Sequence, residues 1–433
     1  MRVVLAATAA LALAAPAWSD PAPESAVNVQ GTFIEQANAG FRAPYQGPNS
    51  LQSDANGREA VDVTLFAGVR PWANAEVWID PEIDQGFGLS HTLGLAAYPN
   101  GGGYKVGAVA PYPKLQRLFL RQSFDLGGKS QAVSPDLNQL GGEVAADRIV
   151  ITLGKMAVTD IFDANPYAHD PNNDFFNWAL IDAGTFDYAA NAWGYTVGGA
   201  AELYLGPFAA RAAAFDLSVV PNSVELDPTF GQFQLIGELE ADPNIAGEPG
   251  AIRITAFVSR ARMARFADAL ALASETGGLP LLAPVRRYQS RPGLSLDLSQ
   301  QITRGLGVFL RAGWADGRLE PYEFTDIDAT LAAGLSVSGE RWGRPGDTLA
   351  IAGVADQISR VHQMFLNAGG LGILVGDGRL PHPGPELANE TYYEIALPRR
   401  VWVTFDYQLF VNPAYNRDRG PVSIGAIRVH TQF

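Results

Sequence analysis

The chain of 433 residues contains no cysteine, and only 18% of its residues are charged. Without cysteine it has no disulfide, no thiolate nucleophile and no zinc site with cysteine ligands. Soluble chains usually carry about a quarter charged residues, so the charged fraction is low. The net charge of −14 also lacks the excess of Lys and Arg that a phosphate backbone requires, which excludes nucleic acid as a partner.

Long apolar runs are missing after the N-terminus, where none approaches the roughly 18 residues of a membrane-spanning helix. A helical membrane protein is therefore excluded. At the N-terminus, Arg2 precedes an apolar stretch at 3–15 that ends in small residues before Asp20. We expect 1–19 to be a signal peptide and 20–433 to be a single exported domain. A buried N-terminal helix is the alternative, and the polar segment that follows disfavours it.

Apolar and polar residues alternate along most of the remaining chain, which is the period of a strand between an apolar and a polar medium. Within 401–410, Val403 and Phe405 share one face, while Thr404 and Asp406 share the other. The sixteen segments of this kind are 27–37, 60–69, 75–80, 115–124, 148–156, 193–205, 208–216, 232–240, 251–259, 288–301, 307–314, 330–338, 349–358, 391–397, 401–410 and 422–433.

The links between these segments alternate in length. Tight turns such as 206–207 and 398–400 alternate with long links at 38–59, 81–114, 157–192, 260–287 and 359–390. Short periplasmic turns and long external loops over an even strand count are typical of an outer-membrane barrel. One link, 126–147, is too long for the periplasmic turn expected at its position. A soluble secreted β-protein has the same local alternation and is the alternative.

We therefore expect an all-β fold, a transmembrane antiparallel β-barrel of about 16 strands in the outer membrane of a Gram-negative cell. It has long extracellular loops and one inward-folded constriction loop. Phe433 shares a face with Ile427 and Val429, which places it at the lipid interface. A terminal Phe is also the usual mark by which the barrel assembly machinery recognises such chains. Outer-membrane lipid and that machinery are the expected partners, and a homotrimer is compatible with the sequence.

Several blocks occur in a characteristic order along 30–433, with the closing block the most specific. They are 31–36, 41–51, 118–124, 159–170, 176–180, 186–188, 376–378 with Glu394, 412–422 and 428–430. Together they resemble the carbohydrate-selective porin family (OprB-type). Asp125 and Gly425-Ala426 depart from the family pattern. The resemblance implies a sixteen-stranded porin for passive, carbohydrate-selective diffusion of monosaccharides or small oligosaccharides into the periplasm.

Such a channel needs no cofactor and no metal, and it is not an enzyme. The chain has neither a Gly-x-Ser-x-Gly elbow nor a His-Glu-x-x-His motif, which disfavours an outer-membrane lipid hydrolase. The acidic segment 170–174 has the opening spacing of a calcium loop, but Phe175 and Ile181 occupy the positions that need Gly and Glu. The main alternative is a non-conducting barrel that binds or assembles surface polysaccharide, because it needs the same lining.

A sugar path requires hydrogen-bond acceptors, bidentate donors and aromatic faces, with no site strong enough to trap the solute. The long link at 160–191 is the candidate constriction loop, since it combines charged, amide and aromatic side chains. Wall candidates lie on the polar face of their strands, and the alternative for each is a structural charge remote from the solute. The candidates are Asp174, Asn177, Trp178 and Asp182 in the loop, and Arg117, Arg121, Arg311, Tyr392, Glu394 and Asp406 on the wall.

Overall fold

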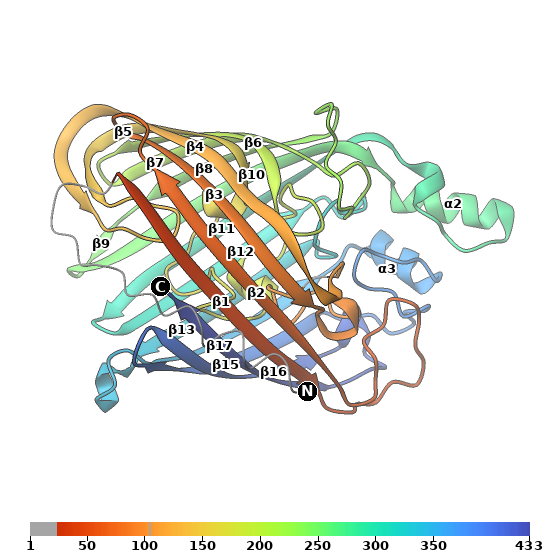
Figure 1. The fold of residues 1–433 in the computed structure, drawn as a ribbon. Helices are drawn as coiled ribbons and strands as arrows, with labels where there is room; N and C mark the ends of the chain where they lie inside the picture. Colours follow the sequence, from red (N-terminus) through yellow and green to blue (C-terminus); the bar gives the residue numbers. More distant parts are fainter. Residues whose placement is uncertain (1–23, 104) are drawn as a thin grey trace.

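The computed structural model describes residues 24–103 and 105–433, which form one antiparallel sheet (Figure 1). The expected signal peptide lies outside these residues. The strands are β1 (Ser25–Asn38), β2 (Asn56–Val69), β3 (Ala75–Gly86), β4 (Ala108–Val133), β5 (Gly142–Met156), β6 (Thr196–Leu205), β7 (Phe208–Asp216), β8 (Phe233–Ala241), β9 (Asn244–Ile245), β10 (Glu248–Met263), β11 (Arg287–Thr303), β12 (Leu306–Ala315), β13 (Ala329–Ser338), β14 (Thr348–Gln357), β15 (Glu386–Leu397), β16 (Val401–Val411) and β17 (Val422–Gln432). The helices are α1 (Trp178–Ile181), α2 (Phe266–Thr276) and α3 (Arg360–Asn367). Among the described residues, no helix is long and apolar enough to cross a membrane.

The sheet closes on itself through its first and last strands. Phe33 of β1 pairs with Val61 of β2 on one side and with Val429 of β17 on the other. The two-residue strand β9 belongs to the turn between β8 and β10, which pair directly, so 16 of the 17 strands form the wall. Each wall strand is paired along both sides, which leaves no free edge in the hydrocarbon. The expected sixteen-stranded barrel is confirmed.

The closed wall has an apolar outer face and a polar inner face. In β10, Ile252 and Ile254 are 41% and 47% exposed, whereas Arg253 and Thr255 between them are 8% and 1% exposed. The same alternation was expected from the sequence of each strand. It is the arrangement of a membrane barrel, since the apolar rows of a soluble sandwich would meet in a dry core.

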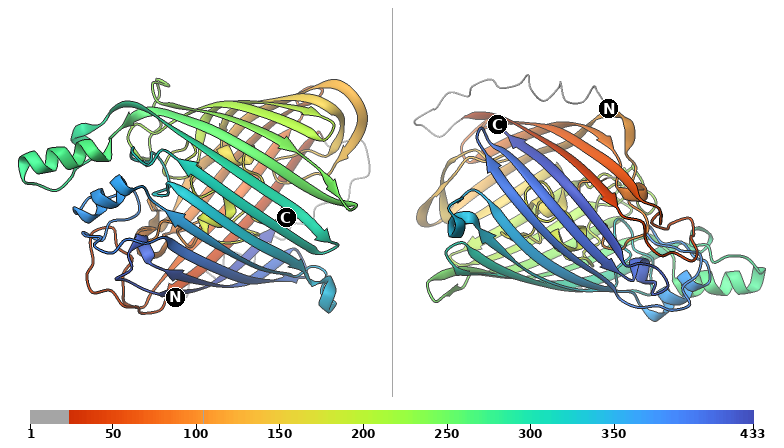
Figure 2. Two further views of the ribbon diagram at one scale, coloured as in Figure 1. Left: turned by 180° about the vertical axis from the view of Figure 1, so that it is seen from behind. Right: turned by 90° about the horizontal axis from the view of Figure 1, so that it is seen from below.

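Turns and loops lie at opposite ends of the barrel (Figures 1 and 2). The short links and Phe433 lie at one end, called the turn end below. The long links, with α2 and α3, lie at the other end, called the loop end. This separation matches the alternation of short and long links in the sequence.

The link at 126–147 is mostly strand, because β4 and β5 are longer than the alternation predicted. β4 continues to Val133 and β5 begins at Gly142, so that 126–133 and 142–147 form a two-stranded ribbon beyond the neighbouring strands. Only 134–141 connects them. Figure 1 shows this ribbon curving at the turn end. Gly127 and Gly128 have positive φ angles of 129° and 81°, beside shifts of register, which lets the ribbon bend.

The apolar outer face predicts that a charged side chain destabilises the barrel where it faces lipid but not at the turn end. Ile254→Arg should lower the free energy of unfolding in lipid vesicles by about 2 kcal/mol, because an arginine on the lipid face must leave water. The same change at Ile245, which is 57% exposed in the turn-end strand β9, is the matched control and should leave stability unchanged. Urea titrations followed by heat-modifiable gel migration measure both. Equal losses at the two positions would contradict the assignment of the outer face.

Candidate functional site

The loop between β5 and β6, residues 157–195, folds into the barrel and is called the inner loop. It includes the short helix α1, and its central residues Phe175, Phe176 and Trp178 are buried. The sequence predicted an inward fold for this segment. The inner faces of β8, β10, β12, β15 and β17 hold it in place.

Arg311 on β12 is the principal cationic anchor of the inner loop. Its guanidinium donates to the carbonyl oxygens of Asp163, Ala168 and Leu180 at 3.0, 2.8 and 2.5 Å. The same group lies 2.9 Å from the carboxylate of Asp297 on β11, which neutralises it. One fully buried side chain therefore fixes three points of the loop.

Carboxylates of the wall hold the loop amides in the complementary way. Glu390 on β15 accepts hydrogen bonds from the backbone nitrogens of Phe176 and Asn177 at 2.6 and 2.9 Å. Glu238 on β8 accepts from the backbone nitrogen of Asp163 at 2.9 Å. These bonds satisfy backbone groups that the loop has carried away from bulk water.

Aromatic packing fills the space between the loop and this part of the wall. The ring of Phe175 lies 5.9 Å from Phe309 and 5.0 Å from Tyr392, both edge to face. Phe186 lies 5.2 Å from Phe257 on β10. The side of the lumen along β10 to β15 is therefore a packed core rather than an open path.

A second loop also folds inward, in addition to the one expected. It lies between β3 and β4, with 87–103 and 105–107 as its described residues, and its Tyr98 ring stacks on Trp178 with centroids 5.4 Å apart. The Tyr98 carbonyl accepts from the Trp178 backbone nitrogen at 3.0 Å, and Phe176 accepts from Gly101 at 2.7 Å. Trp178 thus joins the two loops, and only 1% of it is exposed.

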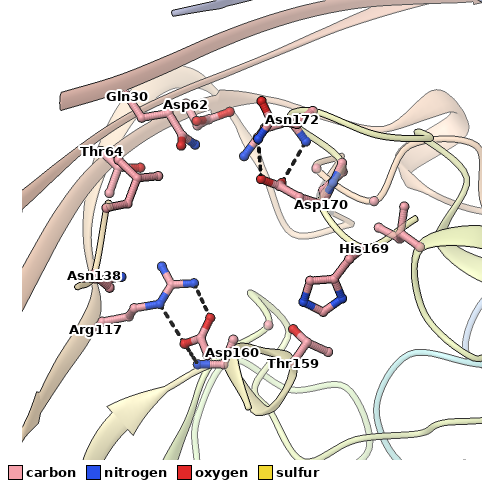
Figure 3. A pocket seen from close by; sticks show the side chains of 18 of the residues that line it. Gln30, Asp62, Thr64, Arg117, Asn138, Thr159, Asp160, His169, Asp170 and Asn172 are labelled. Carbon is pink, nitrogen blue, oxygen red and sulfur yellow. Dashed lines mark hydrogen bonds and ion pairs between the residues drawn. The ribbon is translucent and has the colours of Figure 1, made fainter. Parts of the chain in front are cut away.

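A cavity of about 500 Å³ remains between the inner loop and the wall made by β1 to β4. Polar side chains surround it, as Figure 3 shows, with Gln30, Asp62 and Thr64 on the wall opposite Thr159 and His169 of the loop. The 87–107 loop and the segment 134–141 also contribute to its lining.

The lining is acidic. It contains six carboxyl side chains, one arginine and one histidine. The six are Asp62, Glu82, Asp136, Asp160, Asp170 and Asp182. Burial lowers the pKa of His169 below its usual value, and the nearby charge of Arg311 lowers it further, so that this ring is neutral. Arg117 is therefore the cation of the lining.

Arg117 presents its guanidinium to the cavity in a paired state. It donates to both oxygens of Asp160, at 2.8 and 2.7 Å (Figure 3), and lies 3.7 Å from Asp80. Its guanidinium carbon is 5.1 Å from the centre of the ring of Tyr195, a half-buried residue that also lines the cavity. Burial raises the pKa of Asp182 well above its usual value, and the charge of Asp163 adds to this effect.

The predicted residues divide into two groups by position. Arg117, Trp178 and Asp182 line the cavity, and Arg121 lies beside the segment 134–141. The other six take part in contacts between the inner loop and the wall or within the wall. These are Asp174, Asn177, Arg311, Tyr392, Glu394 and Asp406.

Sequence reasoning missed most of the polar lining. Asp62 and Thr64 were recognisable as the polar face of a strand. Nothing in the sequence indicated that the inner loop leaves a cavity beside this strand. Asp160, His169 and Asp170 lie in a block singled out for its resemblance, without a role for each side chain. Within the described residues, no group of three or more His, Asp or Glu side chains could hold a metal ion.

The model of the carbohydrate-selective porin, OprB family, matches residues 49–433. The chain belongs to this family. OprB-type porins are β-barrel proteins of the outer membrane, and they are channels rather than enzymes.

Solved structures agree with the family assignment at the level of the fold. The high-pH structure of Pseudomonas putida OprB has a TM-score of 0.71 and 15% identity, with 95% of this chain and 94% of that chain covered. The low-pH structure of P. putida OprB has a TM-score of 0.51 and 12% identity, with 95% and 93% covered. A comparison with curated proteins finds no match.

Because Arg311 anchors the inner loop, we expect different effects from replacing the two arginines that contact Asp297. Arg311→Met should release the loop, with higher conductance and faster protease cleavage within 157–195, because three loop carbonyls lose their donor. Arg253 also pairs with Asp297, at 3.4 Å, and with Glu240, but it does not contact the loop.

Arg253→Met is therefore the matched control. Each variant leaves a buried carboxylate with less compensation, which costs about 3–5 kcal/mol, so stability alone does not separate them. Planar-bilayer conductance and limited proteolysis do. Equal conductance for the two variants would contradict the anchoring role of Arg311.

Proposed function

We propose that this OprB-family porin allows passive, carbohydrate-selective diffusion of monosaccharides or small oligosaccharides into the periplasm. Solute enters at the loop end, and the turn end faces the periplasm. The observation that carries the proposal is the polar cavity of about 500 Å³ between the inner loop and β1 to β4. Its lining combines acceptors, one guanidinium fork and the aromatic rings of Trp193 and Tyr195.

The chemistry of this lining suits a neutral polyol. Sugar hydroxyls donate to carboxylates and accept from a guanidinium, while the apolar face of the ring packs on an aromatic side chain. An excess of carboxylates disfavours anions along the path. We assign solute contact to Asp62, Arg117, Asp160, Trp193 and Tyr195.

We also propose roles for the two ends of the chain and for the outer face of the barrel. Residues 1–19 act as the export signal and 20–433 as one domain. The outer apolar row contacts lipid, and Phe433 is read by the assembly machinery. A non-conducting barrel that binds surface polysaccharide would have the same lining, so the experiments below also distinguish it.

The charge of the lining predicts selectivity among sugars of similar size. In planar bilayers the protein should give stepwise current that glucose reduces, and in liposome swelling glucose should enter faster than glucuronate, because carboxylates repel the anion. A barrel without current would favour the polysaccharide-binding alternative. Faster entry of glucuronate than of glucose would contradict the role of the acidic lining.

Trp193 and Trp72 provide a matched pair of tryptophans. Trp193 lines the cavity, whereas Trp72 is 55% exposed in the turn between β2 and β3. Trp193→Ala should weaken the block of current by glucose several-fold, because the ring face that packs on the sugar is lost. Trp72→Ala should leave the block unchanged. Glucose titrations of single-channel current measure both, and an unchanged block in Trp193→Ala would remove this ring from the path.

A further inference from the structure

The segment 134–141, called the tip segment, connects the two strands of the ribbon and returns to the barrel mouth. The ribbon lies beyond the rim of the turn end, and Lys129 within it is exposed. Four residues of the tip segment nevertheless line the same cavity as Arg117 and Asp160. They are Asp136, Leu137, Asn138 and Gln139. The ribbon therefore bends back and brings the tip segment over the lumen.

Polar groups of β3 and β4 hold the tip segment against the wall. Arg121 on β4 donates to the Asn138 carbonyl oxygen at 2.8 Å. The Asn138 side-chain amide in turn donates to the carboxylate of Asp80 on β3 at 2.9 Å. Arg121 also lies 3.3 Å from Glu76, so its guanidinium bridges the wall and the tip segment. Figure 3 shows Asn138 at the edge of the cavity, beside Arg117.

Contacts at the end of the tip segment complete the attachment. The Leu140 backbone nitrogen donates to Glu76 at 3.2 Å, and the Gly141 carbonyl accepts from Arg70 at 3.2 Å. The Leu140 side chain is 2% exposed and belongs to the buried apolar cluster of the barrel. In a hairpin surrounded by water this side chain would be exposed. Its burial, together with the contacts to the wall, fixes the inward position of the tip segment.

We propose that the tip segment is a second constriction of the channel, at the turn end, and that Arg121 and Asp80 hold it in place through Asn138. This inference rests on the proposed function and adds a step to it. A sugar that has passed the inner loop must next pass a surface made of the Asp136 carboxyl, backbone carbonyls and the side-chain amides of Asn138 and Gln139. Those groups recognise neutral hydroxyls and give a small uncharged solute no strong binding site. The tip segment thus acts as a specificity-determining element at the exit.

Because the chain lacks cysteine, a single introduced thiol reports on this constriction. Gln139→Cys places the thiol in the cavity lining, and Lys129→Cys places it on the exposed ribbon as the matched control. A charged methanethiosulfonate should cause a stepwise loss of current in Gln139→Cys and none in Lys129→Cys, with labelling of both confirmed by mass. Unchanged current in labelled Gln139→Cys would overturn the constriction.

A second pair of variants tests the attachment. Arg121→Ala should raise the conductance, because the tip segment loses its donor. Arg148→Ala removes the same charge at the turn end, but Arg148 contacts Ala145 and Tyr204 instead, so its conductance should stay at the wild-type value. Equal conductance of Arg121→Ala and wild type would overturn the role of Arg121.

Glucose block of the wild-type current separates this inference from the proposed function. Block by glucose without any effect of the label at position 139 refutes the constriction and leaves the sugar channel intact. An effect of the label without block by glucose supports the constriction and refutes the choice of sugar. A wild-type barrel without current refutes both.

Discussion

A loop that crosses the interior of a barrel carries its backbone amides and carbonyls away from bulk water, and each of them needs a partner. The wall of this barrel provides charged partners of both signs. Arg311 takes three loop carbonyls, and Glu390 takes two loop amides. Charge-assisted bonds of this kind are stronger than neutral ones and have defined directions. The position of the inner loop, and with it the shape of the cavity, depends on this match.

The match divides the polar inner face of the barrel into two parts. Along β10 to β15 the inward side chains pack on the inner loop and are lost to the solute, as Phe175 between Phe309 and Tyr392 illustrates. Along β1 to β4 the inward side chains remain beside the cavity, as Asp62 and Thr64 do. Because the inner loop packs against only one side of the closed wall, the cavity lies along the other side.

This division explains how far the sequence could predict the structure. Period-two alternation found all sixteen wall strands. Each strand faces lipid on one side and the enclosed interior on the other, so apolar and polar residues alternate within its own sequence. This alternation failed at strand ends such as β3, where Pro81 and a shift of register interrupt the pattern. Alternation also placed Arg311 and Asp406 on the inner face. It could not give the loop carbonyls that Arg311 binds, because those lie more than a hundred residues away in the sequence. Asn138 carried no signal, since its place depends on a ribbon that bends back.

The paired state of the lining has a consequence for the strength of solute binding. Arg117 is engaged by Asp160, and Glu82 accepts from Thr64 at 2.5 Å and from Gln116. A sugar hydroxyl that binds either group exchanges one hydrogen bond for another, so the net gain is small. Free charges would bind the same hydroxyls more tightly and hold them longer. Since conduction requires sites that release the solute as readily as they accept it, internal pairing of the polar lining is itself a requirement of a channel.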